Sequence, residues 1–545
     1  MKLSKLFSSI GKSCRRLGHD RVPTRSYCEK KAEPKQESDS VKAVDSNKKG
    51  LVLGVYDSKE GYILTPAAEE VNQKSGGKLC QHLSQLSGEL KQGKAFILTD
   101  LMPEYSAVAL SVLGPKESAY NELESLDEAR ENVRWCVGAG VRRLLRRGCG
   151  AIDADPAGAA DAAAEAAELA AWRFDKFKSD SKAQCEVLPF GQGDKALWKQ
   201  GSIRGRAQNW ARYLSDMPAN KMTPSDLAQE AIDALCPLGV AVAAHGRAWM
   251  AQQRMRAALA VARGSCEEPV VLDVSYAGGA DSPPVLIVAK GVTFDSGGMC
   301  LKKCDSMSEN RGSMAGAAVA LAAIKALALL KAPINVAAII PLCENMVSGQ
   351  CMKVGDVVKA LNGLSIQIEN TDFEGRLMMA DALVYGQILY RPSLVVDVAT
   401  FTKGVLMATG GGAFGCFSNS DAAWGAVRRA GALSGDRPWR FPLWNYYHKQ
   451  VTNDVSVDLR NKGSGHATPC LGAAFLKNFV CGDWVHMDIT GVGKVATMAA
   501  PPYLDPRRMT GRPARTLTAF LQDIATSTKD MKQPEKAKLP ASKRS

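Results

Sequence analysis

The stretch Val285-Leu-Ile-Val-Ala289 leads directly into Lys290-Gly-Val-Thr-Phe-Asp-Ser-Gly-Gly298. The five consecutive apolar residues predict a short buried strand. The polar, glycine-rich residues that follow predict a loop at the carboxyl end of that strand. In open α/β sheets these carboxyl ends carry the ligand-binding loops. The stretch therefore indicates a fold class and also a place for a functional site.

Short apolar runs of the same kind recur along the chain and alternate with helical stretches. Alternation of this kind is typical of an α/β fold with a largely parallel central sheet. The length of 545 residues allows two or three domains, and we place a boundary near 200–215. The predicted strands cover 51–56, 95–98, 270–276, 334–340 and 394–398, and the predicted helices cover 123–145 and 161–172.

The two ends of the chain differ in composition from the body. Residues 1–31 hold nine Lys or Arg against two acidic residues, and residues 529–545 hold six against two, within a net charge of +13. The body is therefore nearly neutral, which argues against a nucleic-acid-binding protein with a basic patch on its folded surface. Residues 1–31 have the composition of a mitochondrial transit peptide, with a merely disordered basic tail as the alternative.

The remaining boundaries follow from these composition shifts. We expect a linker over 32–50, an N-terminal α/β domain over 51–205, a C-terminal domain over 206–526 and a disordered basic tail over 527–545. The Ala- and Leu-rich stretch 314–330 contains Lys325 and is shorter than the roughly 20 apolar residues of a membrane span, so we expect a core helix. Fifteen cysteines without paired spacing indicate reduced thiols in a protein that is not secreted.

Three carboxylates stand in two of the predicted loops. Asp295 lies in the first loop, and Asp372 and Glu374 lie in Asn370-Thr-Asp-Phe-Glu-Gly-Arg376. Each loop follows a predicted strand, so the three side chains are expected to converge at one edge of the sheet. A divalent cation, or a pair of cations, would relieve the repulsion between them. The spacing alone leaves a solvated acidic turn as the alternative.

Both loops resemble signatures of the leucyl aminopeptidase family of two-metal peptidases. Residues 290–298 match the family's K-G-[IV]-T-F-D-S-G-G segment, and residues 370–377 are similar to its N-T-D-A-E-G-R-L segment. The likeness is strong over about 205–525 and weaker over about 50–200. Further stretches that carry it are Pro218-Ala-Asn-Lys-Met-Thr-Pro224, Pro341-Leu-Cys-Glu-Asn-Met346, Gly355-Asp-Val-Val358 and Met509-Thr-Gly-Arg-Pro513.

The resemblance implies an architecture and a chemistry. It implies a small N-terminal α/β domain, a larger C-terminal catalytic α/β domain, and a hexamer of two trimers. It also implies up to two Zn²⁺ or Mn²⁺ ions, which activate a water for attack on the N-terminal peptide bond. By the same resemblance, Lys302 polarises the scissile carbonyl and Arg376 holds a bicarbonate. The implied metal ligands are Lys290, Asp295, Asp372 and Glu374.

Three positions depart from the family pattern. Ser313 stands in Arg311-Gly-Ser-Met-Ala-Gly316, where the family has a further aspartate ligand in R-A-D-M-G-G. Lys403 replaces the glycine of the family's T-L-T-G substrate wall, and Asn310 replaces an apolar residue at the side-chain pocket. Mutation of a residue that only supports a metal ligand typically lowers metal affinity or activity by about 10–100-fold. Loss of a charged ligand should lower them by at least as much.

Two hypotheses of different classes follow. The first is a family member with an eroded two-metal site, weak or no peptidase activity and a structural role in mitochondria. This combination resembles the insect sperm leucyl aminopeptidase-like branch, and its partners would be copies of itself or related chains. The second is an active aminopeptidase acting on peptides, because Lys302 and Arg376 are both present. Neither hypothesis requires a nucleic acid or a membrane span.

Overall fold

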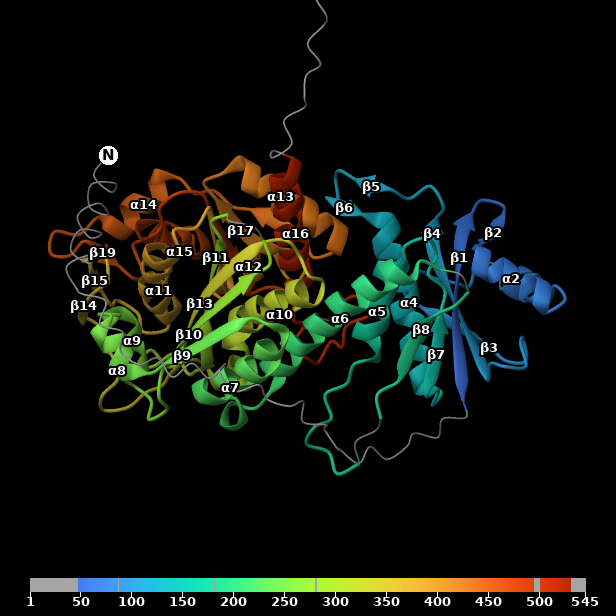
Figure 1. Ribbon diagram of the computed structural model, residues 1–545, viewed down its shortest axis with the longest axis horizontal. Coiled ribbons are helices and arrows are strands. Elements are labelled where there is room, and N and C mark those ends of the chain that lie inside the picture. Colours follow the sequence, from blue (N-terminus) through green and yellow to red (C-terminus); the bar gives the residue numbers. More distant parts are fainter. Residues whose placement is uncertain are drawn as a thin grey trace, which may run out of the picture.

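The computed structural model describes residues 48–530, apart from 87, 181–182, 192, 280–281 and 495–499. The predicted transit peptide, the linker up to residue 47 and residues 531–545 lie outside the described residues. The described chain forms two α/β units connected by the long helix α6 (Lys195–Asp216) (Figure 1). A smaller N-terminal unit is followed by a larger C-terminal unit, so the predicted fold class is confirmed.

The N-terminal unit is built on a six-stranded sheet with the order β3-β4-β1-β7-β8, and β2 also pairs with β1. Neighbouring strands among β4, β1, β7 and β8 run parallel, whereas β2 and β3 are antiparallel to their partners. Two apolar layers cover the sheet, one under α2 and α3 and the other under α4 and α5. The strands are β1 (Lys49–Ser58), β2 (Gly61–Leu64), β3 (Ala95–Leu98), β4 (Ala107–Pro115), β7 (Ala151–Ala154) and β8 (Glu186–Pro189). The helices are α2 (Pro66–Lys74), α3 (Lys78–Gln85), α4 (Glu128–Arg146) and α5 (Ala160–Ala171).

Helix α4 begins later than the sequence pattern predicts. Asp127 caps it by accepting a hydrogen bond from the Arg130 backbone N–H, so the helix starts at Glu128 rather than near residue 123. Leu123, which the pattern places on the apolar face, is 96% exposed in the turn before the helix. An N-cap carboxylate satisfies a backbone donor that has no partner within the helix, and this fixes the first turn more strongly than one apolar residue does.

The C-terminal unit is built on a nine-stranded sheet with the order β18-β17-β20-β16-β11-β13-β10-β9, and β12 also pairs with β13. The centre of the sheet, β20-β16-β11-β13, is parallel, whereas β10 and β9 are antiparallel at one edge. The strands are β9 (Ala241–His245), β10 (Val270–Ala277), β11 (Val285–Ala289), β12 (Gly291–Asp295), β13 (Asn335–Asn345), β16 (Leu394–Ala399), β17 (Phe414–Ser418), β18 (Pro438–Arg440) and β20 (Trp484–Asp488). A separate sheet joins β14 (Val357–Lys359), β15 (Ser365–Gln367) and β19 (Leu459–Arg460).

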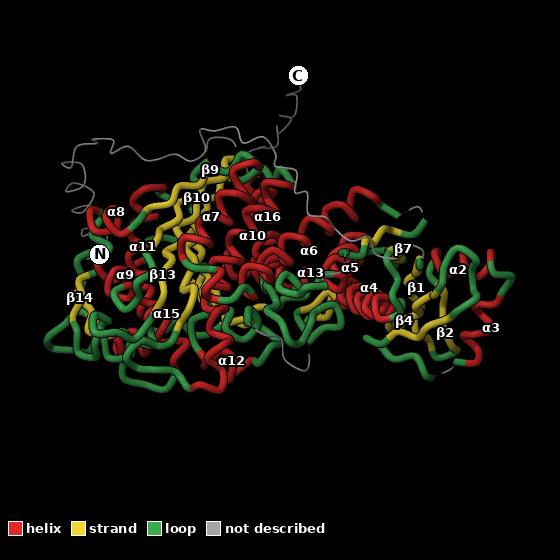
Figure 2. Tube along the Cα trace, turned by 90° about the horizontal axis from the view of Figure 1, so that it is seen from below, coloured by secondary structure: helices red, strands yellow, loops and turns green. Residues whose placement is uncertain are grey.

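Helices cover both faces of this central sheet (Figure 2). One face packs against α6, α7 (Pro224–Leu235), α10 (Ala315–Leu329), α13 (Asp421–Ser434) and α16 (Ala514–Asp530). The other face packs against α8 (Arg247–Gln252), α9 (Arg256–Ala262), α11 (Glu374–Tyr390), α14 (Asn445–Thr452) and α15 (Thr468–Leu476). The stretch Cys304–Leu329 is long and apolar enough to cross a membrane, but 83% of its most apolar window is buried inside the protein.

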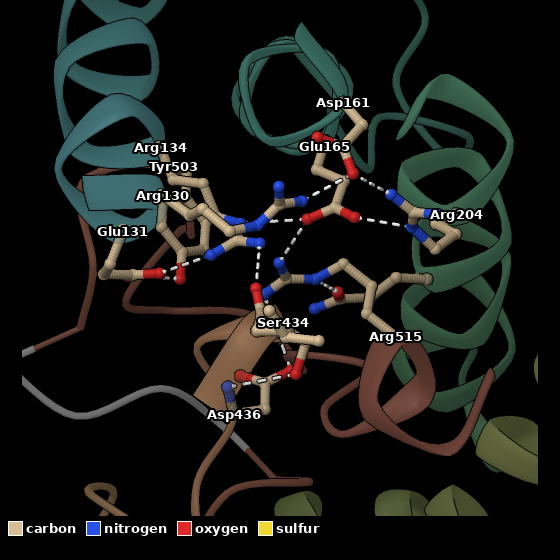
Figure 3. Close-up of polar contacts among 12 residues, drawn as sticks. Arg130, Glu131, Arg134, Asp161, Glu165, Arg204, Ser434, Asp436, Tyr503 and Arg515 are labelled. Atoms are coloured by element: carbon tan, nitrogen blue, oxygen red, sulfur yellow. Dashed lines mark hydrogen bonds and ion pairs between the residues drawn. The ribbon is translucent and has the colours of Figure 1, made fainter. Parts of the chain in front are cut away.

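A buried ionic junction connects the two units (Figure 3). At its centre is Glu165 of α5, whose side chain is 2% exposed. Its carboxylate accepts hydrogen bonds from Arg134 of α4 at 2.9 Å, Arg204 of α6 at 2.6 Å and Arg515 of α16 at 2.9 Å. Burial raises the pKa of Glu165, but the three guanidinium groups outweigh it and hold the pKa far below its usual value. Arg515 belongs to the C-terminal unit, so this carboxylate binds both units together.

We predict that Glu165→Gln lowers the free energy of unfolding by about 3–5 kcal/mol, because it leaves buried guanidinium groups without a compensating charge. Calorimetric unfolding of the intact protein measures the change. The matched control is Arg206→Ala, which removes an ion pair to Glu168 in which the arginine side chain is 70% exposed. That exposed pair should contribute no more than about 1 kcal/mol. Equal effects of the two substitutions would contradict the assignment of Glu165 as the junction.

Candidate metal centre

The first predicted loop contains an additional strand. Lys290 lies between β11 and β12, and β12 pairs in parallel with β13 and ends at Asp295. Asp295 Oδ1 accepts hydrogen bonds from the Gly297 backbone N–H and from Asn345 Nδ2, both at 2.9 Å. Gly297 has a φ of 90°, and a Cβ there would lie 2.5 Å from the Cys300 carbonyl oxygen. The loop can therefore close around Asp295 only with glycine at this position.

We expected the second loop to follow a strand of the central sheet, but it does not. The strand that precedes it, β15, belongs to the separate three-stranded sheet, and the loop continues directly into α11, with Glu374 as its first residue. The two loops meet nevertheless, because Thr371 Oγ1 donates to the Gly297 carbonyl oxygen at 2.7 Å and accepts from the Cys300 backbone N–H at 2.8 Å. The side chains converge through packing between the two loops rather than through a shared sheet edge.

The three predicted carboxylates form one cluster. Asp295, Asp372 and Glu374 each offer an oxygen, and these oxygens all lie within 4.8 Å of one another. Two lysines neutralise part of this charge: Lys290 Nζ lies 2.6 Å from Glu374 Oε1, and Lys302 Nζ lies 3.0 Å from Asp295 Oδ2. Lys302 also contacts Asp372. Lys290 Nζ donates a further hydrogen bond to the Thr400 carbonyl oxygen at 3.0 Å.

The pKa values in the cluster reflect burial and mutual interaction. Burial, reinforced by the charge of Asp295, raises the pKa of Glu374 to about 7. Burial also raises the pKa of Asp372, although Lys302 opposes this effect. At Asp295 burial raises the pKa, but Lys302 and Lys290 outweigh it and the pKa is lowered. At both lysines burial lowers the pKa, but the neighbouring carboxylates more than compensate and the pKa is raised.

The cluster fits a divalent cation. Glu374 Oε1 is fully buried and has no hydrogen bond, since its contact with Lys290 Nζ is an ion pair without hydrogen-bond geometry. Carboxylate oxygens are suitable ligands for Mn²⁺ and Zn²⁺, and the Lys290 amine becomes a ligand if binding displaces its proton. Ser313, at the position where we expected a fourth carboxylate to be missing, is 2% exposed and brings no charge to the site.

Lys302 and Lys403 face a cavity of about 670 Å³ that opens beside the cluster. Asp372, Phe401 and His466 also line this cavity. Lys403 is the first residue of α12 (Lys403–Thr409) and its side chain is exposed. The structure therefore places Lys403 on the wall of the cavity, beside the cluster.

Arg376 is buried behind the cavity wall. Its guanidinium donates to the carbonyl oxygens of Asn461 and, at 3.3 Å, of Thr468, and it stacks over the Phe373 ring at 4.6 Å. Burial lowers its pKa to about 10, so the group remains charged at neutral pH. Arg376 therefore supports the segment that lines the cavity while keeping one positive charge near it.

The structure also identifies residues that sequence reasoning missed. Asn345 and Thr371 orient the first loop. Thr400 bridges two predicted positions, because its carbonyl accepts from Lys290 Nζ and its hydroxyl donates to the Ser313 carbonyl oxygen at 3.0 Å. Lys494 Nζ donates to Asn310 Oδ1 at 3.3 Å. Lys494 is a single lysine far along the chain from both loops, so no local pattern could have indicated it.

Comparisons with known proteins agree with this geometry. Residues 209–518 match the catalytic domain of the cytosol aminopeptidase family, and residues 52–181 match its N-terminal domain. The cytosol aminopeptidase of Xenopus tropicalis is 41% identical over 486 residues, which are 87% of this chain and 93% of that protein. The cytosol aminopeptidase of Homo sapiens is 40% identical over 482 residues, again 87% of this chain and 92% of its own.

Solved structures show the same relation. The bottromycin maturation enzyme BotP superposes with a TM-score of 0.74 at 27% identity, over 88% of this chain and 100% of that one. A second structure of BotP is a complex with Mn, with the same TM-score and identity. Both family domains are present in order, and the loops that carry the family's signature segments enclose the carboxylate cluster. The chain therefore belongs to the cytosol aminopeptidase family.

Proposed function

We propose that this protein has a weakened two-metal site, little or no peptidase activity and a structural role in mitochondria. The proposal rests on Ser313, a buried neutral residue where the resemblance implies a further aspartate ligand. Its carbonyl oxygen accepts from the hydroxyl of Thr400, whose own carbonyl oxygen accepts from Lys290 Nζ. The polar Asn310 and the exposed Lys403 alter the surroundings of the same cluster. The three changes lie around one site, whereas both family domains are kept. This combination favours a protein that has lost peptidase activity but has kept its fold.

The residues that remain define what chemistry the site still supports. A divalent ion held by Asp295, Asp372, Glu374 and the Lys290 amine would act as a Lewis acid and lower the pKa of a bound water. Lys302, charged and facing the cavity, is placed to stabilise negative charge on a carbonyl oxygen. Because these groups are intact, the second candidate is an active aminopeptidase dependent on Mn²⁺ or Zn²⁺, with Arg376 as the residue to hold a bicarbonate.

Exposed aromatic side chains support the structural role. Trp439 on β18, Trp444 just before α14 and Tyr446 on α14 are 62%, 66% and 68% exposed. Large exposed aromatic groups are enriched where proteins meet other proteins. We propose that this surface contributes to assembly with copies of the same chain or with related chains.

A peptidase assay separates the two candidates. We expect the protein, supplied with Mn²⁺ or Zn²⁺, to hydrolyse leucine amide well below the 1–10³ s⁻¹ of ordinary enzymes. The double substitution Ser313→Asp and Lys403→Gly should restore part of the turnover, because it returns a ligand and clears the cavity wall. Turnover of ordinary size by the unmodified protein would refute the proposal. A double variant that binds two ions yet stays inert would show that other residues disable the site.

Metal binding should depend on pH, since Glu374 has a pKa of about 7 in the metal-free site. Below pH 7 a proton competes with the ion for Glu374, and this competition should raise Mn²⁺ affinity by up to about tenfold per pH unit until it ends near pH 7. Displacement of the Lys290 proton, whose pKa is raised above its usual value, should add up to about tenfold per pH unit below pH 7 and above it. Titration calorimetry between pH 5.5 and 8 measures this dependence.

The matched control for this titration is Glu344→Gln. Glu344 is another carboxyl whose pKa is raised by burial, but it binds Ser265 at 2.6 Å rather than the cluster. The control should keep the pH dependence, whereas Glu374→Gln should weaken Mn²⁺ binding and make the curve less steep below pH 7. An affinity that is constant over this range would contradict the assignment of Glu374 as a ligand.

Location is tested by removing residues 1–31. We expect the full chain, fused at its carboxyl end to a fluorescent protein, to enter mitochondria and the truncated chain to stay in the cytosol, because the basic serine-rich segment is the predicted import signal. Fluorescence microscopy with a mitochondrial marker gives the readout. A truncated chain that is still imported would refute the assignment of this segment.

A further inference from the structure

A third lysine, Lys494, interacts electrostatically with the carboxylate cluster. Lys494 lies six residues after the end of β20, and its Nζ donates to Asn310 Oδ1 at 3.3 Å. Asn310 is itself 5% exposed. The ammonium group of Lys494, which is half-buried, is therefore held by a buried neutral amide.

The amide that holds Lys494 stands next to the missing carboxylate. Asn310 and Ser313 both lie on the 3₁₀ helix η4 (Cys304–Met314) and are both buried. Side chains three residues apart eclipse one another on a 3₁₀ helix, so Asn310 and Ser313 share one face, one turn apart. Lys494 is thus anchored directly beside the position where the family pattern has an aspartate ligand.

The electrostatic surroundings of Lys494 connect it to the cluster. Burial, together with repulsion from Lys290 and Lys302, lowers its pKa to about 8, and Asp295 opposes the change. The ammonium group therefore lies within electrostatic reach of Asp295 and of both lysines that bind the carboxylates. With a pKa near 8 it is largely charged at neutral pH.

With one divalent ion, this group of residues carries the same net charge as a four-carboxylate site with two divalent ions. Asp295, Asp372 and Glu374 supply three negative charges, and Lys302 and Lys494 supply two positive charges once Lys290 ligates as a neutral amine. One divalent ion then leaves the site at +1. A site with a fourth carboxylate at position 313 and no lysine at 494 reaches the same +1 only with two divalent ions. The absence of a carboxylate at position 313 and the presence of a lysine at position 494 therefore add two positive charges, which equal the charge of one divalent ion.

We propose that the ammonium group of Lys494 takes the place of the second divalent ion, so that each chain binds one ion at Asp295, Asp372, Glu374 and Lys290. This inference rests on the proposed weakening of the two-metal site. A second ion beside Ser313 would lack a charged ligand at that position. It would also lie next to the Lys494 ammonium group, and the repulsion between two neighbouring positive charges would weaken its binding. Asn310 fits the role, since an amide oxygen accepts from an ammonium group where an apolar side chain could not.

The test measures Mn²⁺ stoichiometry and affinity in the full-length protein and in Ser313→Asp, Lys494→Met and the double variant, by titration calorimetry and by metal analysis after dialysis. We expect one ion in the unmodified protein and in Lys494→Met. Ser313→Asp should take up a second ion weakly, and the double variant should bind it at least about tenfold more tightly than Ser313→Asp does. Lys494→Arg, combined with Ser313→Asp, should keep the second ion weak because it keeps the charge.

The matched control is Lys325→Met, combined with Ser313→Asp. Lys325 is another lysine whose pKa is lowered by burial, but it lies over the Trp210 ring at 4.6 Å, on α10. This control should leave the second ion as weak as in Ser313→Asp alone. Thermal unfolding of every variant shows whether it is folded. If a methionine at 494 disturbs packing, the double variant Ser313→Asp and Lys494→Arg still tests the effect of charge, because it changes the side chain and keeps the positive charge.

Two outcomes would overturn the inference. The first is two tightly bound ions in the unmodified protein. The second is a second-ion affinity in Ser313→Asp that Lys494→Met does not change, or that Lys325→Met changes equally. Neither readout depends on turnover, so a failure here is distinguishable from a failure of the proposed function, which depends on the rate of peptide hydrolysis.

Discussion

Three carboxylates held within 4.8 Å of one another in the interior require positive charge beside them, and the design of the site follows from this constraint. Lys290 and Lys302 provide part of that charge, and a divalent ion provides the rest in a metallopeptidase. The hydrogen bonds from Asn345 and Gly297 to Asp295 hold one carboxylate in place against this repulsion. Any change in the number of carboxylates must therefore be matched by a change in the number of cations.

The docking of the two units depends on a different part of the molecule. Glu165 and its three arginines connect α4, α5, α6 and α16, and none of these helices carries a residue of the carboxylate cluster. A buried ionic junction of this kind is expensive to break but need not add much net stability, so its value is in fixing how the two units dock. Substitutions in the metal site can accordingly alter chemistry while the architecture persists.

The residues that we propose to weaken the site fall into two groups. Ser313 and Asn310 share one face of η4, and Lys494 is bonded to that face. Lys403 lies on the cavity wall together with Lys302. Asp372 and Glu374, just before and at the start of α11, lie in the segment that resembles the family signature. Ser313, Asn310 and Lys494 therefore adjoin one another, whereas Lys403 lies at the cavity that Asp372 also lines.

The sequence alone was sufficient for the α/β class, for most of the strands and for the two loops that carry the carboxylates, because apolar runs and glycine-rich signatures are local properties. It could not place the start of α4, which depends on a single capping carboxylate at Asp127, nor the separate sheet that contains β15. The contact of Lys494 with Asn310 spans 184 residues, and the Glu165–Arg515 contact spans 350. Contacts at such separations leave no local pattern in the chain, so only the packing of distant elements decides which charges meet.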